Sequence, residues 1–172
     1  MYISSKITSE FATWVDSKIQ NIALKRKKCL ILDLDNTLWG GVLGEEGING
    51  IQIGGDYPGK AFLYFQEALS ALSKEGIILS VCSKNNEEDV FDAWEQNPFM
   101  VLRKKDFVAI RINWNDKASN IVELSKELNI GLDSMVFIDD NPAERELVKQ
   151  TLPMVAVPDF PKQAYMLSLI HI

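Results

Sequence analysis

A buried strand that ends in two carboxylates constrains this chain more than any other stretch. The apolar run Cys29–Leu32 is followed by Asp33, Leu34 and Asp35. A nearly continuous apolar run is typical of a strand buried on both faces of a parallel sheet. A charge at the end of such a strand is costly unless a partner compensates it, and neighbouring carboxylates add repulsion. Because ligands bind at the carboxyl ends of strands in open α/β sheets, this position predicts a functional site.

The rest of the chain alternates between apolar strands and amphipathic helices. Strand patterns follow at residues 77–82, 107–112, 134–138 and 154–157, and helix patterns at residues 60–74, 87–96, 115–128, 142–151 and from about 159. This alternation predicts a doubly wound α/β fold with a five-stranded, parallel, Rossmann-like sheet and helices on both faces. The glycine-rich stretch from Trp39 to Tyr57 has apolar residues between its glycines, and predicts a small β-hairpin flap.

Composition excludes several kinds of function. The 172 residues carry a net charge of −6, which argues against binding of nucleic acid, because that needs a basic surface. No stretch approaches the roughly 18 apolar residues that a membrane span needs, and the N-terminus lacks the apolar core of a signal peptide. The only cysteines, Cys29 and Cys82, lie in apolar runs and are expected to be buried thiols, which favours a reducing, cytoplasmic setting.

The ends of the other strands also carry polar groups: Ser83 and Lys84 after the second, Lys117 after the third, and Asp139 and Asp140 after the fourth. Taken alone, Ser83 is also typical of a strand end, and Lys117 of an exposed helix. A lysine in the first turn of a helix opposes the helix dipole, however, so a nearby anion would explain it. Asn141 already serves as a helix cap, so the acidic pair before it needs a metal or another counter-charge.

Together these groups fit phosphoryl transfer. Asp33 would attack phosphorus as the nucleophile and form an aspartyl-phosphate. Asp35 would protonate the leaving oxygen and then take a proton from the water that hydrolyses the intermediate. Several carboxylates with oxygen-only ligation favour Mg²⁺. Lys117 and the Ser83 hydroxyl would hold the remaining phosphoryl oxygens.

The motifs resemble those of the haloacid-dehalogenase superfamily. The resemblance rests on D-L-D-N-T from Asp33 to Thr37, on Ser83, on Lys117 and on I-D-D from Ile138 to Asp140. Four longer strings resemble the FkbH-like subgroup: D-N-T-L-W-G-G-V-L-G, C-S-K-N-N, R-I-N-W-N-D-K-A-S-N-I and F-I-D-D-N-P-A-E-R-E. The resemblance covers nearly everything from residue 28 to residue 157.

The superfamily resemblance implies Asp33 as nucleophile and Asp35 as general acid and base. It also implies Mg²⁺ held by Asp33, by the backbone carbonyl of Asp35 and by the pair Asp139 and Asp140, and leaves open which of that pair binds directly. The residues expected to bind substrate are Thr37, Ser83, Lys84 and Lys117.

The subgroup resemblance implies a Mg²⁺-dependent phosphatase or phosphotransferase that acts on a phosphorylated metabolite such as a three-carbon acid. It associates the chain with glyceryl loading in polyketide biosynthesis or with polysaccharide biosynthesis. The expected partners are a phosphorylated small molecule, and an acyl carrier protein or an additional domain of the same chain. Neither nucleic acid nor a membrane is expected as a partner.

We expect residues 1–27 to contribute a helix, over about 8–25, that packs on the core, and residues 28–172 to form the catalytic domain. The connections from Asp33 to Ser83 and from Ser83 to Lys117 have no room for an inserted cap domain. Trp39 and Trp114 are therefore candidates to line the opening of an uncapped active site, with packing in the core or the flap as the alternative. The apolar C-terminus, residues 164–172, suggests a domain cut from a longer protein, or an interface.

Two other functions share some of these features. A receiver-like signalling module also uses Mg²⁺ and a phosphorylated aspartate, but there the acidic pair comes first, whereas here the candidate nucleophile does. The other is a catalytically weak domain that binds a phosphorylated or carrier-protein-bound acid. The basic cluster Arg103–Lys105 could then meet an acidic carrier, although a solvated loop explains it as well.

Overall fold

The computed structural model describes residues 27–161 together with Thr13 and Ser17. Apart from those two residues, the helix predicted over 8–25 lies outside the described residues, as does the apolar segment 164–172. Most of the helix predicted from about residue 159 lies outside them too. No helix in the described part of the chain is long and apolar enough to span a membrane.

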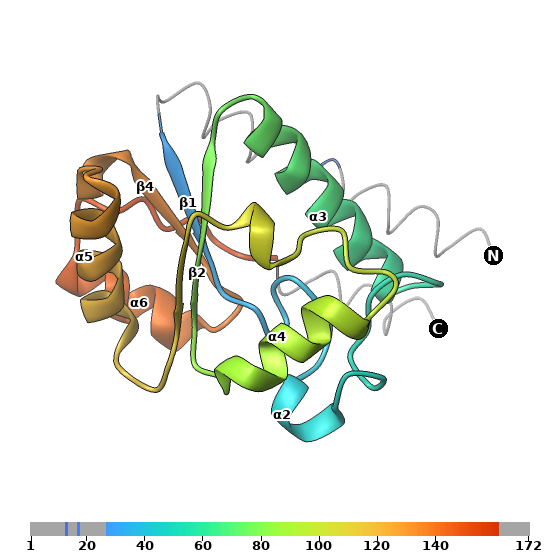
Figure 1. Ribbon diagram of the computed structural model, residues 1–172. Helices are drawn as coiled ribbons and strands as arrows, with labels where there is room; N and C mark the ends of the chain where they lie inside the picture. Colours follow the sequence, from blue (N-terminus) through green and yellow to red (C-terminus); the bar gives the residue numbers. More distant parts are fainter. Residues whose placement is uncertain (1–12, 14–16, 18–26, 162–172) are drawn as a thin grey trace.

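The described residues form an α/β fold around one parallel sheet of four strands (Figure 1). The strands are β1 (Cys29–Leu32), β2 (Ile78–Ser83), β3 (Ala109–Ile112) and β4 (Met135–Ile138). Their order is β3-β2-β1-β4, so the chain builds outward from β1 on one side and then returns to its other side. The carboxyl ends of β1 and β4 therefore meet at the point where the strand order reverses, which is where ligands of such sheets bind.

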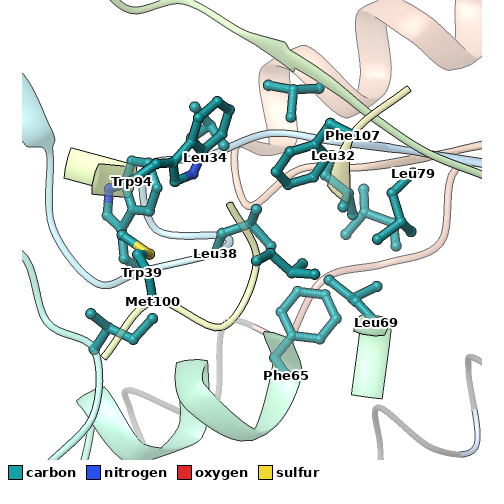
Figure 2. Close-up of a cluster of buried hydrophobic side chains, with 14 of the residues drawn as sticks. Leu32, Leu34, Leu38, Trp39, Phe65, Leu69, Leu79, Trp94, Met100 and Phe107 are labelled. Carbon is teal, nitrogen blue, oxygen red and sulfur yellow. The ribbon is translucent and has the colours of Figure 1, made fainter. Parts of the chain in front are cut away.

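Helices cover both faces of the sheet, as the alternating pattern predicts (Figure 1). α3 (Gly59–Lys74) and α4 (Glu87–Gln96) contribute to a larger apolar core on one face, and α5 (Lys117–Leu128) and α6 (Pro142–Thr151) to a smaller core on the other. Alternate residues of β1 point to the two cores, Leu30 and Leu32 to the larger and Cys29 and Ile31 to the smaller. Figure 2 shows part of the larger core, including Trp39, Trp94 and Phe107.

The prediction of a fifth strand over residues 154–157 is wrong. Only Ala156 pairs there, in a single parallel bridge with Val136. Its backbone N–H donates to the Met135 carbonyl at 3.1 Å, and its carbonyl accepts from the Phe137 N–H at 2.9 Å. Pro153 and Pro158 enclose this segment, and prolines have no N–H to donate to a sheet. The two prolines therefore explain why the pairing does not extend.

The predicted β-hairpin flap is wrong in its extent. Residues 39–57 are closed by one antiparallel bridge, in which Gly40 and Gln52 exchange N–H···O bonds of 2.9 and 2.8 Å. Between them lies α2 (Leu43–Glu46), a single helical turn. Four apolar residues of this stretch lie buried in the larger core, Trp39, Leu43, Ile51 and Ile53. Because these four side chains point inward, the stretch covers the core and does not form a free two-stranded ribbon.

The buried side chain of Gln66 connects three segments on the larger core. Its Nε2 donates to the Leu38 carbonyl at 2.8 Å, and its Oε1 accepts from the backbone N–H groups of Val101 and Leu102 at 3.1 and 2.9 Å. Gln66 is fully buried on α3, as are Leu38 and Leu102, while Val101 is partly exposed. The glutamine thus joins α3 to the loop after β1 and to the loop before β3.

Replacing Gln66 with alanine should lower the free energy of unfolding by about 2–4 kcal/mol, because it leaves buried backbone donors and an acceptor without partners. Urea unfolding measures the change. Gln150→Ala, an exposed glutamine on α6, is the matched control and should stay within about 0.5 kcal/mol of the parent. A loss at Gln66 no larger than that of the control would contradict the assigned role.

Candidate functional site

Polar groups from four elements meet at the carboxyl edge of the sheet. Asp33 follows β1, Asp139 follows β4, and Lys117 begins α5. The Lys117 Nζ lies 2.9 Å from Asp33 Oδ1 and 2.5 Å from Asp139 Oδ2. Ser83, the last residue of β2, is buried beside Asp33, and its hydroxyl lowers the pKa of the Asp33 carboxyl. The structure therefore brings together the residues that the strand ends predict.

Three carboxylates form one cluster at this edge. Among the described residues, Asp33, Asp139 and Asp140 place one ligand atom each within 4.8 Å of one another. Asp33 and Asp139 are buried, and Asp140 is partly exposed. Such a cluster of hard oxygen donors is chemically suited to a divalent cation such as Mg²⁺. The Asp35 carboxylate is not part of it, and the predicted contact through the Asp35 backbone carbonyl stays a prediction.

Lys117 is a buried lysine between two carboxylates. Asp116 caps α5 by accepting from the Ser119 N–H at 2.8 Å, so the helix starts at Lys117 and its side chain turns towards the sheet. Burial alone would lower the pKa of Lys117, but Asp33 and Asp139 together raise it above its ordinary value. The ammonium group is therefore charged at every physiological pH.

The carboxyl groups of the cluster hold protons more tightly than ordinary aspartates. Burial is the main cause that raises the pKa of Asp139 to about 6 and that of Asp140 to about 7. Burial also raises the pKa of Asp33, against the lowering effect of Lys117. Between 3.8, the ordinary value, and about 7, the folded chain binds protons that the unfolded chain has released. The contribution of these groups to stability therefore falls as the pH rises through this window.

Thr37 lies beneath the acidic pair. It is fully buried, and its Oγ1 accepts from the Asp140 N–H at 3.2 Å and lies 3.5 Å from Asp140 Oδ1. Thr37 thus supports the loop that carries Asp140. Its predicted contact with substrate stays a prediction.

Lys84 lies at the same edge but is already paired. Its Nζ lies 2.6 Å from Glu144 Oε1 in the first turn of α6, and about a third of the Lys84 side chain is exposed. A substrate anion would have to compete with Glu144 for this ammonium group. The substrate-binding role predicted for Lys84 stays a prediction.

Asp35 lies in an environment unlike that of Asp33. Its Oδ1 accepts from Trp39 Nε1 at 2.9 Å and from the Leu43 N–H at 3.0 Å, and its Oδ2 accepts from Asn85 Nδ2 at 2.8 Å. The side chain of Trp39 is fully buried, so the prediction that it lines the opening is wrong and the core-packing alternative holds (Figure 2). Trp114, in the loop before Lys117, is 73% exposed.

Two residues near the site were not expected from the sequence. Asn85 is one: its spacing from Glu88 predicts a helix cap, whereas the structure has Asn86 at the cap and Asn85 on Asp35. The other is Arg145, which is buried on α6 and donates Nη1 to the carbonyls of Asp139 and Asp140 at 2.8 and 2.7 Å. An arginine near the start of a helix opposes the helix dipole, as Lys117 does, and that signal could have identified it.

In the basic cluster Arg103–Lys105, two of the three side chains make contacts within the chain. The Arg103 guanidinium donates to the carbonyls of Trp94 and Asn97 at the end of α4. The Lys104 ammonium lies 3.6 Å from the centre of the Phe91 ring. Arg103 therefore acts as a helix cap, and the docking of an acidic carrier on this cluster stays a prediction.

Residues 28–166 match the family model described as NLI interacting factor-like phosphatase. The chain belongs to this phosphatase family. The match confirms the predicted enzyme class, and similar solved structures named as HAD family proteins share the fold. The FkbH-like subgroup stays a prediction. The search of curated proteins gives no match.

One solved structure with a phosphatase domain is similar to this chain in both sequence and fold. It is the N-terminal part of the protein BF1531 from Bacteroides fragilis, which contains a phosphatase domain complexed with Mg. This chain is 52% identical to it with a TM-score of 0.79, over 81% of this chain and 38% of that one. The chain thus spans well under half the length of that relative.

Two further structures support the fold. A HAD family enzyme from Bacteroides thetaiotaomicron, crystallised with magnesium and inorganic phosphate, is 14% identical with a TM-score of 0.53, over 78% of this chain and 94% of that one. A HAD-superfamily hydrolase of subfamily IA from Geobacter sulfurreducens is 12% identical with a TM-score of 0.51, over 77% of this chain and 86% of that one.

In this member of the phosphatase family, Lys117→Met should lower the free energy of unfolding by about 3–5 kcal/mol at pH 8, because it leaves buried carboxylates without their cation. The loss should be smaller at pH 5, below the raised pKa values of Asp139 and Asp140, where these groups can take up protons. Urea unfolding at both pH values measures the difference. Lys126→Met, an exposed lysine in the last turn of α5, should change little at either pH. An equal loss at both pH values for Lys117→Met would contradict the account.

Proposed function

We propose that this chain is a Mg²⁺-dependent phosphatase that acts through an aspartyl-phosphate on Asp33. The observation that carries the proposal is the Asp33 carboxylate, buried at the strand-order reversal, paired with Lys117 and beside two further carboxylates. A buried carboxylate with fixed orientation and a neighbouring cation suits nucleophilic attack on an anionic phosphorus centre.

The residues present fit Mg²⁺. Asp33, Asp139 and Asp140 would hold the ion, since they offer oxygen ligands within 4.8 Å of one another. Burial and neighbouring carboxylates raise the pKa of Asp139 and Asp140, and a bound divalent cation would oppose this by favouring the charged forms. The relative that is 52% identical is crystallised with Mg. When bound, the ion would reduce the repulsion between these carboxylates and the phosphoryl oxygens.

The chain's own residues would carry the two steps. A carboxylate oxygen of Asp33 forms a bond to phosphorus while the ester P–O bond breaks, and Asp35 gives its proton to the leaving oxygen. Water then attacks the aspartyl-phosphate, Asp35 takes a proton from that water, and the Asp33 carboxylate leaves. Lys117 would stabilise the negative charge on the phosphoryl oxygens in both steps. Phosphotransfer to another acceptor would replace the water in the second step.

The substrate we propose is a phosphorylated small metabolite, such as a three-carbon acid in glyceryl loading or polysaccharide biosynthesis. Lys84 and the exposed Trp114 are the groups at the site edge that could contact its non-phosphate part. An acyl carrier protein or a further domain of the same chain is the partner we propose, on the resemblance to the FkbH-like subgroup. Cys29 and Cys82 are buried free thiols, in keeping with a cytoplasmic setting.

Asp33→Asn should lower phosphate release from an aryl phosphate by about 10³-fold or more, because an amide is not a nucleophile of comparable strength. Removal of Mg²⁺ with a chelator should abolish release by the parent chain and re-addition should restore it. Asp133→Asn is the control, since Asp133 is exposed just before β4, at the opposite edge of the sheet.

Undiminished activity in Asp33→Asn would overturn the nucleophile assignment. A panel of phosphorylated three-carbon acids and sugar phosphates, assayed with and without acyl carrier protein, then ranks the substrates by kcat/KM. If none is turned over by the parent chain while one binds, the domain binds its ligand without catalysis, and the proposed activity fails.

A further inference from the structure

The Asp35 carboxylate receives three hydrogen bonds from three different segments of the chain. Trp39 comes from the turn after β1, Leu43 from the start of α2, and Asn85 from the loop after β2. All three donor–acceptor distances lie between 2.8 and 3.0 Å. Contacts to both carboxylate oxygens fix both side-chain torsions of Asp35.

The donors themselves are held rigidly. Trp39 is fully buried in the larger core, so packing of its ring sets the position of its N–H (Figure 2). Asn85 is 5% exposed and follows β2, whose residue Val81 pairs with Leu32 of β1. The Leu43 N–H belongs to the stretch of residues 39–57, which the Gly40–Gln52 bridge closes. The pairing of β1 with β2, the packing of the core and the bridged stretch of residues 39–57 therefore each position one donor to the Asp35 carboxylate.

The arrangement distinguishes the two oxygens of Asp35. Each carboxylate oxygen has two lone pairs. Oδ1 accepts two hydrogen bonds, from Trp39 and Leu43, and so has no further lone pair to offer. Oδ2 accepts one, from Asn85, among the described residues, and keeps one lone pair for a proton.

We infer that Trp39 and Asn85 are positioning residues for Asp35, and that Oδ2 is the oxygen that carries the transferred proton. The inference rests on the proposed role of Asp35 as general acid and base. In the first step the proton moves from Oδ2 to the leaving oxygen as the ester P–O bond breaks. In the second, a proton of the attacking water returns to Oδ2. Proton transfer needs hydrogen-bond reach to the reacting oxygen, so loss of orientation lowers the rate.

The test compares two substrates that differ in their need for a general acid. The leaving group of p-nitrophenyl phosphate departs without a proton, whereas the alkoxide of glycerol phosphate requires one. Trp39→Phe, which keeps the ring and removes the N–H, and Asn85→Ala should each lower kcat/KM for glycerol phosphate by about 10- to 100-fold. The same variants should lower kcat/KM for p-nitrophenyl phosphate by less than about threefold. The ratio kcat/KM reports the first step, before water enters.

Two matched controls separate positioning from general damage to the fold. Trp94→Phe removes another buried indole N–H, one that has no hydrogen-bond partner among the described residues. Asn86→Ala changes the neighbouring exposed asparagine, whose side chain makes no cap hydrogen bond to α4. Both controls should leave the ratio of the two kcat/KM values unchanged, whatever they do to the melting temperature.

Asp35→Asn shows how much kcat/KM falls when the general acid is lost. It also separates failure of the proposed Asp35 role from failure of the positioning role. If Asp35→Asn lowers kcat/KM equally for both substrates, the proposed role of Asp35 fails. If Asp35→Asn affects glycerol phosphate selectively but Trp39→Phe and Asn85→Ala affect both substrates equally, the positioning role fails. Should Asn85→Ala not fold, Asn85→Leu, which has a similar size and no donor, takes its place with the same expected selectivity.

Discussion

The ion pairs of the buried Lys117 with Asp33 and Asp139 are the interaction on which the site depends. Without a cation, buried carboxylates at the ends of two neighbouring strands would repel each other and lack water. The lysine can reach both because α5 begins at Lys117, where Asp116 caps it. One charged side chain thus makes the ends of β1 and β4 compatible with the core below them.

Around this centre, buried polar side chains orient the functional groups. Arg145 holds the carbonyls of Asp139 and Asp140, and Trp39 and Asn85 hold the Asp35 carboxylate. Two aspartates only two residues apart thereby occupy different environments, one beside an ammonium group and one among neutral donors. This difference is the physical basis for giving Asp33 and Asp35 different proposed tasks, since environment decides what a carboxyl group can do.

The strand ends were predictable because apolar runs and the cost of burying charge are local properties of the sequence. They place Asp33, Ser83, Lys117 and the acidic pair at one edge, as the structure has them. The fifth strand and the extent of the hairpin were mispredicted because they depend on tertiary packing, which also decides between the two readings of Trp39. The ion pair of Lys84 with Glu144 could not be predicted, because it joins residues that are far apart in the sequence.

The most direct test of the central claim is to trap the covalent intermediate. The chain with Mg²⁺ and its best substrate is quenched in acid during turnover, digested, and examined by mass spectrometry. The account predicts a phosphoryl group on the peptide that contains Asp33, lost on treatment with hydroxylamine and absent in Asp33→Asn. A substrate that turns over with no phosphorylated aspartate, or with the phosphoryl group on another residue, would contradict it.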